Sequence, residues 1–129
     1  MIKVDVKKLS NYPVSTVKIK KVLQDALESY GLNSDAYVSV AIVGEKKMTE
    51  IAQIYLKEKN VVHNVLTFSS SDTKTTFRYP PEHLLDVGEI IVCYPKAEEE
   101  ALGEGILVEE KILALIEHGA SHLMGHHHE

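Results

Sequence analysis

Short apolar runs alternate with helix-like segments along this chain, and this alternation restricts the possible folds more than any other feature. The runs "AYVSVAIV" (36–43) and "GEIIVCY" (88–94) are rich in β-branched residues and have the length of buried strands. Between such runs, apolar residues recur every three or four positions, as on the inner face of an amphipathic helix. Helices placed between strands predict an α+β layered sandwich in which a mixed sheet of about four strands packs against helices.

The expected elements follow one another in a simple order. Strands are expected at 2–6, 36–43, 64–68 and 88–94. Helices are expected at 14–30, 47–57 and 107–124, with a further helical stretch after Pro95 that is broken near Gly103 and Gly105. The polar segment 69–83 contains two prolines and predicts a loop.

Length and composition suit one domain that spans residues 1–129. With 44% hydrophobic residues the chain can form one core, and no apolar run approaches the length of a membrane-spanning helix. Charges scattered through the first ten residues are unlike the apolar region of a secretory signal, and one cysteine, Cys93, excludes an intramolecular disulfide. We therefore expect a cytoplasmic protein with no membrane partner.

Charge is unevenly distributed along the sequence. The net charge of -5 argues against attraction of nucleic acid to the whole surface. Lysines are nevertheless concentrated in the first half, with six lysines and one aspartate in residues 1–21. This pattern is compatible with a basic face for RNA, and equally with ordinary solvated helix surfaces.

The sequence ends in "HGASHLMGHHHE", which contains a possible metal site. His118 and His122 are four residues apart and share one face of the last predicted helix. Gly125 can end this helix in the left-handed conformation and turn the chain, so that His128 joins the pair. The resulting H-x-x-x-H-x-x-G-x-x-H spacing is that of metzincin zinc sites. Three imidazoles with an open fourth position suit a catalytic ion, so we predict one Zn²⁺ per chain.

Two other interpretations of these histidines compete with the metal site. An i, i+4 pair can belong to an exposed helix face, and "HHH" can be the remnant of a purification tag. Tags usually carry more histidines, and this run continues a helical pattern and ends in Glu129. His126 and His127 remain alternative third ligands, and nickel and copper also accept three imidazoles. A metalloprotease would have glutamate after the first histidine, where this chain has Gly119.

Three separate segments together resemble the YbeY family of bacterial metal-dependent endoribonucleases. Residues 118–129 resemble its H-G-x-x-H-L-x-G-x-D-H-E signature, "NVLTF" (64–68) is similar to T-D-V-L-S-F, and "VGEIIVC" (87–93) to G-D-I-V-I-C. Their order and spacing match, so the resemblance extends over roughly residues 36–129. It implies an α+β sandwich with zinc at the end of a cleft, and cleavage of single-stranded RNA in ribosomal RNA maturation and ribosome quality control.

The resemblance also implies roles for individual residues. The metal ligands would be His118, His122 and His128. Lys57 matches an arginine that projects into the family's cleft, and it would stabilise charge on the phosphate. His63 lies near the cleft by the same analogy and could transfer protons, as histidines do near neutral pH.

Further residues are expected around these. Substrate contacts are expected from Lys57, Lys59, Asn64 and Thr67. Glu89 could support the metal as a neighbouring acid, whereas Cys93 is expected to be a buried strand residue.

Departures from the family pattern support a second interpretation. Lys57 lacks the bidentate fork of arginine, His63 replaces a threonine, and Asn64 replaces an acidic residue and cannot act as a base. His127 replaces the aspartate before the last histidine, a possible partner for a ligand. The chain could therefore be a noncatalytic metal-containing factor that binds ribosomal RNA or a ribosomal protein. A zinc hydrolase acting on a small substrate is a third, weaker alternative.

Overall fold

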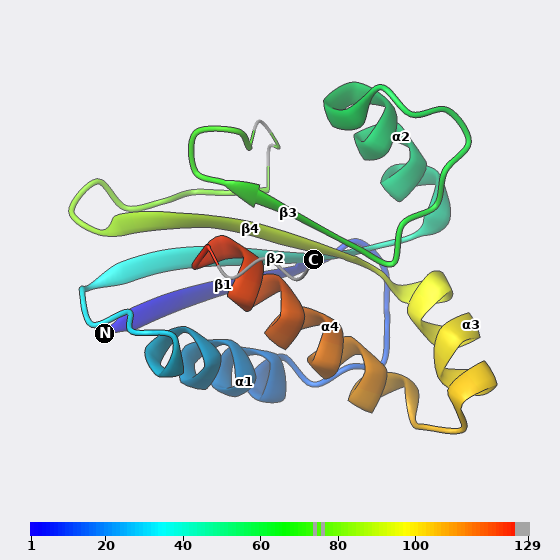
Figure 1. Cartoon of the computed structure of the whole chain (residues 1–129), viewed down its shortest axis with the longest axis horizontal. Coiled ribbons are helices and arrows are strands. Elements are labelled where there is room, and N and C mark those ends of the chain that lie inside the picture. Colours follow the sequence, from blue (N-terminus) through cyan, green and yellow to red (C-terminus); the bar gives the residue numbers. More distant parts are fainter. Residues whose placement is uncertain (74, 76, 126–129) are drawn as a thin grey trace.

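The computed structural model describes residues 1–73, 75 and 77–125, in which helices and strands follow the predicted order (Figure 1). The elements are β1 (Ile2–Lys8), α1 (Thr16–Ser29), β2 (Ala36–Val43), α2 (Glu45–Leu56), β3 (Val65–Ser69), β4 (Leu85–Cys93), α3 (Tyr94–Glu104) and α4 (Val108–Leu123). The main difference is β4, which begins at Leu85 and not at Gly88. Its ladder with β2 continues past an irregularity at Tyr37 and Val38, where Gly88 has a φ of 139°.

The sheet is mixed, with the strand order β1-β2-β4-β3. β1 pairs with β2 and β2 pairs with β4 in parallel, whereas β3 runs antiparallel to β4. Every residue of β2 is buried, as expected for a strand with neighbours on both sides and layers on both faces. The predicted α+β class with a mixed sheet is confirmed.

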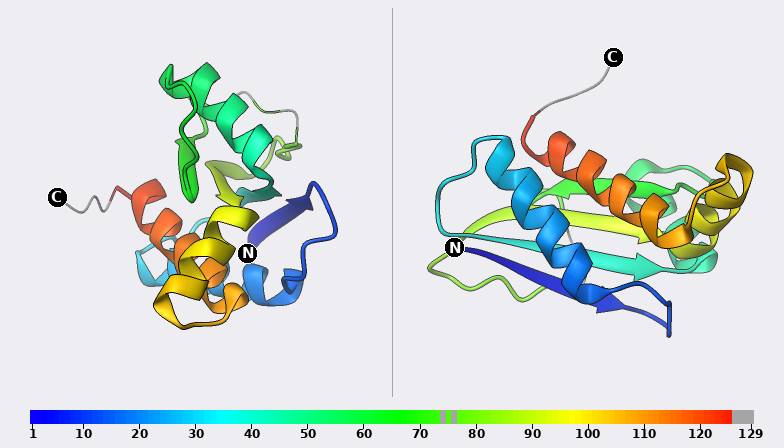
Figure 2. Two further views of the ribbon diagram at one scale, coloured as in Figure 1. Left: turned by 90° about the vertical axis from the view of Figure 1, so that its right-hand side faces the viewer. Right: turned by 90° about the horizontal axis from the view of Figure 1, so that it is seen from below.

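Helices cover the two faces of the sheet unequally. α1 and α4 lie side by side on one face, as the view from below in Figure 2 shows. They pack on that face with Ile90 and Val92 of β4, while α2 packs on the other face with Ile91 and Cys93. Because side chains alternate along a strand, each residue of β4 belongs to one of these two faces. The histidines of α4 belong to the α1–α4 face.

A carboxylate at the start of α4 fixes this helix against α1. Ser15 caps α1 by accepting a hydrogen bond from the Lys18 backbone N–H at 3.2 Å. Glu109 accepts hydrogen bonds from the Ser15 backbone N–H at 2.8 Å and from Lys18 Nζ at 2.9 Å. The Lys18 and Ser15 contacts lower the pKa of Glu109, so this contact persists at neutral pH.

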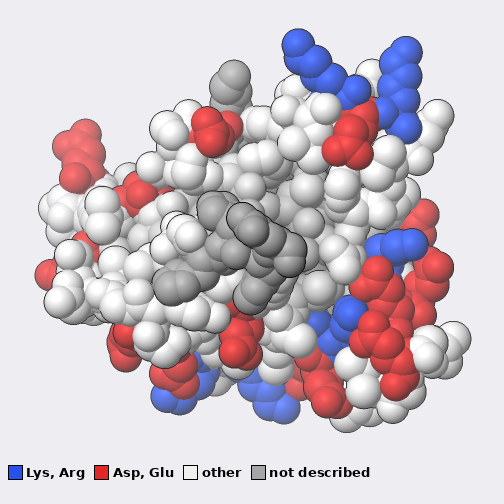
Figure 3. Space-filling model, viewed as in Figure 1, with Lys and Arg blue, Asp and Glu red and all other residues white. Residues whose placement is uncertain are grey.

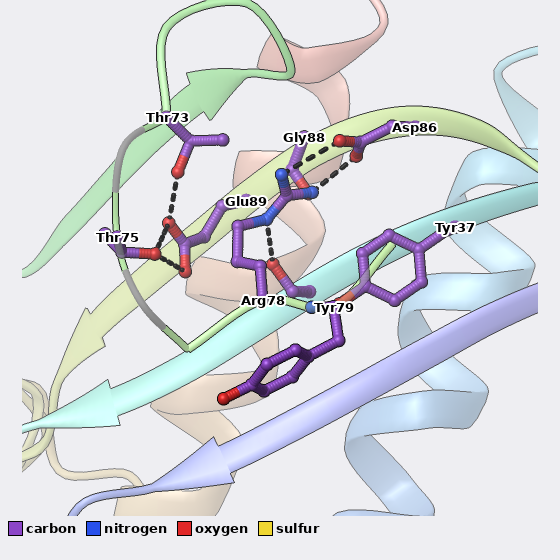
Figure 4. A network of polar contacts seen from close by, with 9 residues as sticks. Tyr37, Thr73, Thr75, Arg78, Tyr79, Asp86, Gly88 and Glu89 are labelled. Atoms are coloured by element: carbon purple, nitrogen blue, oxygen red, sulfur yellow. Dashed lines mark hydrogen bonds and ion pairs between the residues drawn. The ribbon is translucent and has the colours of Figure 1, made fainter. Parts of the chain in front are cut away.

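The connection between β3 and β4 is fastened to the sheet by buried polar contacts (Figure 4). Arg78 forms a two-pronged ion pair with Asp86, and its side chain is only 6% exposed. Its Nε donates to Ser39 Oγ at 2.7 Å and its Nη2 donates to the Gly88 carbonyl at 2.8 Å. The predicted loop between β3 and β4 is therefore held by Arg78 against the face of the sheet on which α2 packs.

Glu89 belongs to the same polar cluster, and its buried position leads us to expect that the stability of the fold depends on pH. Its carboxylate is fully buried and accepts hydrogen bonds from Thr73 and Thr75 at 2.7 and 2.8 Å. Burial raises the pKa of Glu89 although the threonines and Arg78 oppose this. Because the pKa of Glu89 is higher in the folded than in the unfolded chain, the group stabilises the fold fully below the ordinary glutamate pKa of about 4.3. This contribution to the free energy of unfolding is lost as the pH rises through the pKa in the folded state.

The substitution Glu89→Gln is expected to remove this loss of stability, because the amide oxygen still accepts from the threonines but does not ionise. Urea unfolding between about pH 4 and pH 7 measures it as the difference between the two pH profiles. An identical decline in both proteins would show that another group is responsible.

Among the described helices, none combines the length and the apolar character needed to cross a membrane.

Candidate functional site

The C-terminal half of α4 brings two histidine rings together. The Nε2 atoms of His118 and His122 lie 2.9 Å apart, and the ring centroids are 4.5 Å apart. A lone pair on one nitrogen must therefore face the other nitrogen, and the atoms that bind metals point toward the same place. The helix supplies two converging imidazole donors from a single turn.

The end of α4 agrees with the prediction from the sequence. The helix is capped at Met124, and Gly125 follows with a φ of 82° in the left-handed region. A left-handed glycine directly after the cap is a common way for a helix to end. The predicted third ligand, His128, lies outside the described residues, as do its alternatives His126 and His127.

Gly119 allows α4 to approach the sheet closely beside the histidines. A Cβ atom at this position would lie 3.1 Å from two side-chain atoms of Ile90 and 3.1 Å from Thr67 Cγ2. Such distances are tight for carbon atoms, so only glycine fits without a shift of its neighbours. This contact holds His118 and His122 beside β3.

The substitution Gly119→Ala is expected to destabilise the fold by about 1–3 kcal/mol, because overpacking outweighs the better helix propensity of alanine. Urea unfolding measures this change. The matched control is Gly103→Ala, since a Cβ at Gly103 in α3 would meet nothing within 4 Å. Equal effects at both glycines would contradict the close packing of α4.

A cleft lies between α4 and β3, two elements that contact one another. It has a volume of about 380 Å³. Its described lining residues are Asn64, Val65, Leu66, Thr67, Leu115, His118, Gly119 and His122. Asn64 and Thr67 are the residues of this lining, besides the two histidines, that have polar side chains.

Asn64 is held at both its backbone and its side chain. Its carbonyl oxygen accepts from the Cys93 N–H at 2.9 Å, and its Nδ2 donates to Glu100 Oε1 at 2.9 Å. Glu100 also pairs with Lys111, whose Nζ lies 3.4 Å from Glu100 Oε1. Sequence reasoning missed Glu100 because it is the last of three successive glutamates on an otherwise ordinary helix.

The other predicted site residues lie in the segment between α2 and β3. Lys57 is the left-handed residue that ends α2, with a φ of 55°, and it is exposed like Lys59. His63 Nε2 lies 3.1 Å from Glu58 Oε2. The described cleft lining does not include these three predicted residues. They could therefore contact only a ligand that extends beyond the cavity.

The expectation that Glu89 supports the metal is wrong. Glu89 pairs in register with Phe68, which packs on the α2 face, whereas Thr67 and Ile90 contact Gly119 of α4. Alternation along β4 therefore turns Glu89 away from the histidines. Cys93 is fully buried, as predicted.

Charged side chains lie around the cleft but not in its described lining. Figure 3 shows acidic side chains gathered over α3, and two basic side chains projecting near α2. The residues described as lining the cavity include no lysine, arginine, aspartate or glutamate. A cation bound by the histidines would therefore bring positive charge to a part of the cleft whose described lining has none.

The two histidines fit part of a zinc site. Neutral imidazole is a preferred zinc donor, and the two Nε2 atoms converge. Among the residues that the structure describes, no set of three or more histidines, cysteines, aspartates or glutamates could hold an ion. The predicted set of three ligands depends on His128.

The sequence is similar to a known protein family and to individual members of it. Residues 5–129 match the family described as Endoribonuclease YbeY. Endoribonuclease YbeY of Macrococcus caseolyticus is 31% identical over 111 residues, covering 86% of this chain and 71% of that protein. Endoribonuclease YbeY of Dehalococcoides mccartyi is 29% identical over 123 residues, covering 90% and 72%.

The fold has a solved counterpart. The solution structure of TM1509 from Thermotoga maritima matches with a TM-score of 0.60 and 24% identity, covering 100% of this chain and 75% of that one. At this identity the likeness supports the fold alone. The match over residues 5–129, together with the cleft beside His118 and His122, leads to one conclusion: the chain belongs to the Endoribonuclease YbeY family.

Proposed function

We propose that this chain is a zinc-dependent endoribonuclease that acts as one domain on single-stranded RNA, in ribosomal RNA maturation and ribosome quality control in the cytoplasm. The observation that carries the proposal is the convergence of His118 and His122 on a cleft with Asn64 and Thr67 in its wall. The name Endoribonuclease, carried by its relatives, supports RNA as the substrate.

The proposed ligands of the zinc ion are His118, His122 and His128. When bound, zinc would supply Lewis-acid chemistry to a phosphate oxygen of the RNA. The histidines carry no charge of their own in this role, so the ion would keep its full positive charge for an anionic substrate.

The remaining residues would bind and orient the RNA strand. Thr67 and Asn64 would form hydrogen bonds with it inside the cleft. Lys57 and Lys59 would attract phosphates of the strand where it leaves the cleft toward α2. His63 would transfer a proton, and its contact with Glu58 at 3.1 Å would hold the ring in place.

Cleavage of a labelled single-stranded RNA by tag-free protein, purified without immobilised metal, tests this function. The wild type is expected to give internal cleavage products, and His122→Ala is expected to lose at least about a hundredfold in rate. His83→Ala is the matched control, because His83 is exposed, lies in the β3–β4 connection and does not belong to the described cleft lining. Equal rates for all three proteins would contradict the proposed site.

A noncatalytic factor that binds ribosomal RNA or a ribosomal protein remains the second candidate. It is favoured by the amide at position 64, because the described cleft lining offers no carboxylate that could act as a base. In that case the metal would serve the structure alone.

The substitution Lys57→Arg separates the two candidates. If the chain is an enzyme, the guanidinium fork should hold a phosphate better and raise cleavage by about three- to tenfold. Lys46→Arg is the control, since Lys46 is an exposed lysine near the start of α2. No cleavage by either form, together with undiminished RNA binding, would support the noncatalytic factor.

A further inference from the structure

The side-chain amide of Asn64 is fixed in one orientation. The Glu100 carboxylate can only accept hydrogen bonds, so the atom that faces it at 2.9 Å must be the donor Nδ2. Glu100 is itself 27% exposed, and Lys111 Nζ lies 3.4 Å from the same oxygen. The amide therefore cannot flip without losing a hydrogen bond to a charged group.

This orientation determines what Asn64 offers to a ligand. The residue lines the cleft together with Thr67, His118 and His122. With Nδ2 directed to Glu100 on α3, Oδ1 is the side-chain atom of Asn64 left to accept a hydrogen bond from a ligand. A carboxylate at position 64 would instead face Glu100 at hydrogen-bond distance, and the two like charges would repel.

We propose that Glu100 is a positioning residue, which orients the Asn64 amide so that its oxygen accepts a hydrogen bond from the substrate. The group that donates this hydrogen bond is the ribose 2′-hydroxyl. This inference rests on the proposed function. A 2′-hydroxyl donates a hydrogen bond, and the 2′ position of DNA does not. Loss of one such hydrogen bond corresponds to about a three- to tenfold change in affinity.

Inhibition of RNA cleavage by two unlabelled oligomers of the same sequence tests the proposal. One oligomer carries a 2′-amino group, which donates, and the other is 2′-deoxy. In the zinc-loaded wild type the 2′-amino oligomer should inhibit more strongly. In Glu100→Ala the ratio of the two inhibition constants should fall about three- to tenfold, and KM for RNA should rise more than kcat falls.

Two further variants separate positioning from a general structural role. Glu100→Gln keeps an oxygen that accepts from Nδ2 and should retain the preference. Glu98→Ala removes the same charge from an exposed position of α3 and should leave the ratio unchanged. An unchanged ratio in Glu100→Ala, or an equal fall in Glu98→Ala, would overturn the inference alone. Failure of the wild type to cleave RNA and to bind either oligomer would overturn the proposed function as well.

Discussion

The substitution Arg78→Ala is expected to lower the free energy of unfolding by about 3–5 kcal/mol, because it breaks a buried ion pair and leaves one partner behind. Arg78 is the single arginine of the sequence and is 6% exposed. Its guanidinium contacts Asp86, Ser39 Oγ and the Gly88 carbonyl, and it lies near the buried Glu89. Without Arg78, the carboxylates of Asp86 and Glu89 would lose the positive charge that the guanidinium places beside them.

Urea unfolding at neutral pH measures the effect. Arg78→Lys keeps the charge but cannot reproduce the fork, so it should recover only part of the lost stability. Lys47→Ala is the control for an exposed ion pair, with Glu50 at 3.7 Å, and should cost less than about 1 kcal/mol. A loss below about 1 kcal/mol in Arg78→Ala would mean that the cluster does not anchor the β3–β4 connection.

The substitution His122→Ala is expected to weaken zinc binding by more than about a hundredfold, since even the loss of residues that only support a ligand costs 10–100-fold. The expected cause is direct: the Nε2 atom that converges on His118 at 2.9 Å is removed. Loss of this half-buried imidazole should leave the core intact, because His122 does not belong to the core cluster.

Equilibrium dialysis against zinc, with the metal per chain counted by mass spectrometry, measures this loss. His83→Ala should bind zinc as the wild type does. Equal zinc content in the wild type and His122→Ala would place the ion elsewhere, and no zinc in the wild type at any concentration would remove the metal from the proposal.

The arrangement of strands and helices could be predicted because local patterns determine it. β2 is apolar at nearly every position since both of its faces are buried, and α4 shows apolar spacing because one side faces the core. The start of β4 could not be found in this way. Its first residues are partly exposed, and a positive-φ glycine interrupts the pattern of alternation.

The histidine pair could be predicted because both members lie on one helix, where spacing alone sets their geometry. Contacts between distant segments had no such signal. The pairing of Asn64 with Glu100 spans 36 positions, and that of Arg78 with Ser39 spans 39. Glu89 was assigned to the wrong face because the pattern of β4 alone does not say which layer covers which face. A lone arginine in a lysine-rich chain was the one sequence signal for the buried cluster.

The measurement that tests the central claim most directly is the rate of single-stranded RNA cleavage by metal-stripped protein as zinc is added back. A zinc-dependent endoribonuclease should be inactive without metal, and its rate should rise and level off near one zinc per chain. Cleavage at the full rate without metal would contradict the role of zinc. If the protein binds one zinc ion per chain and still leaves RNA intact, the result would contradict the proposed endoribonuclease activity and favour the noncatalytic factor.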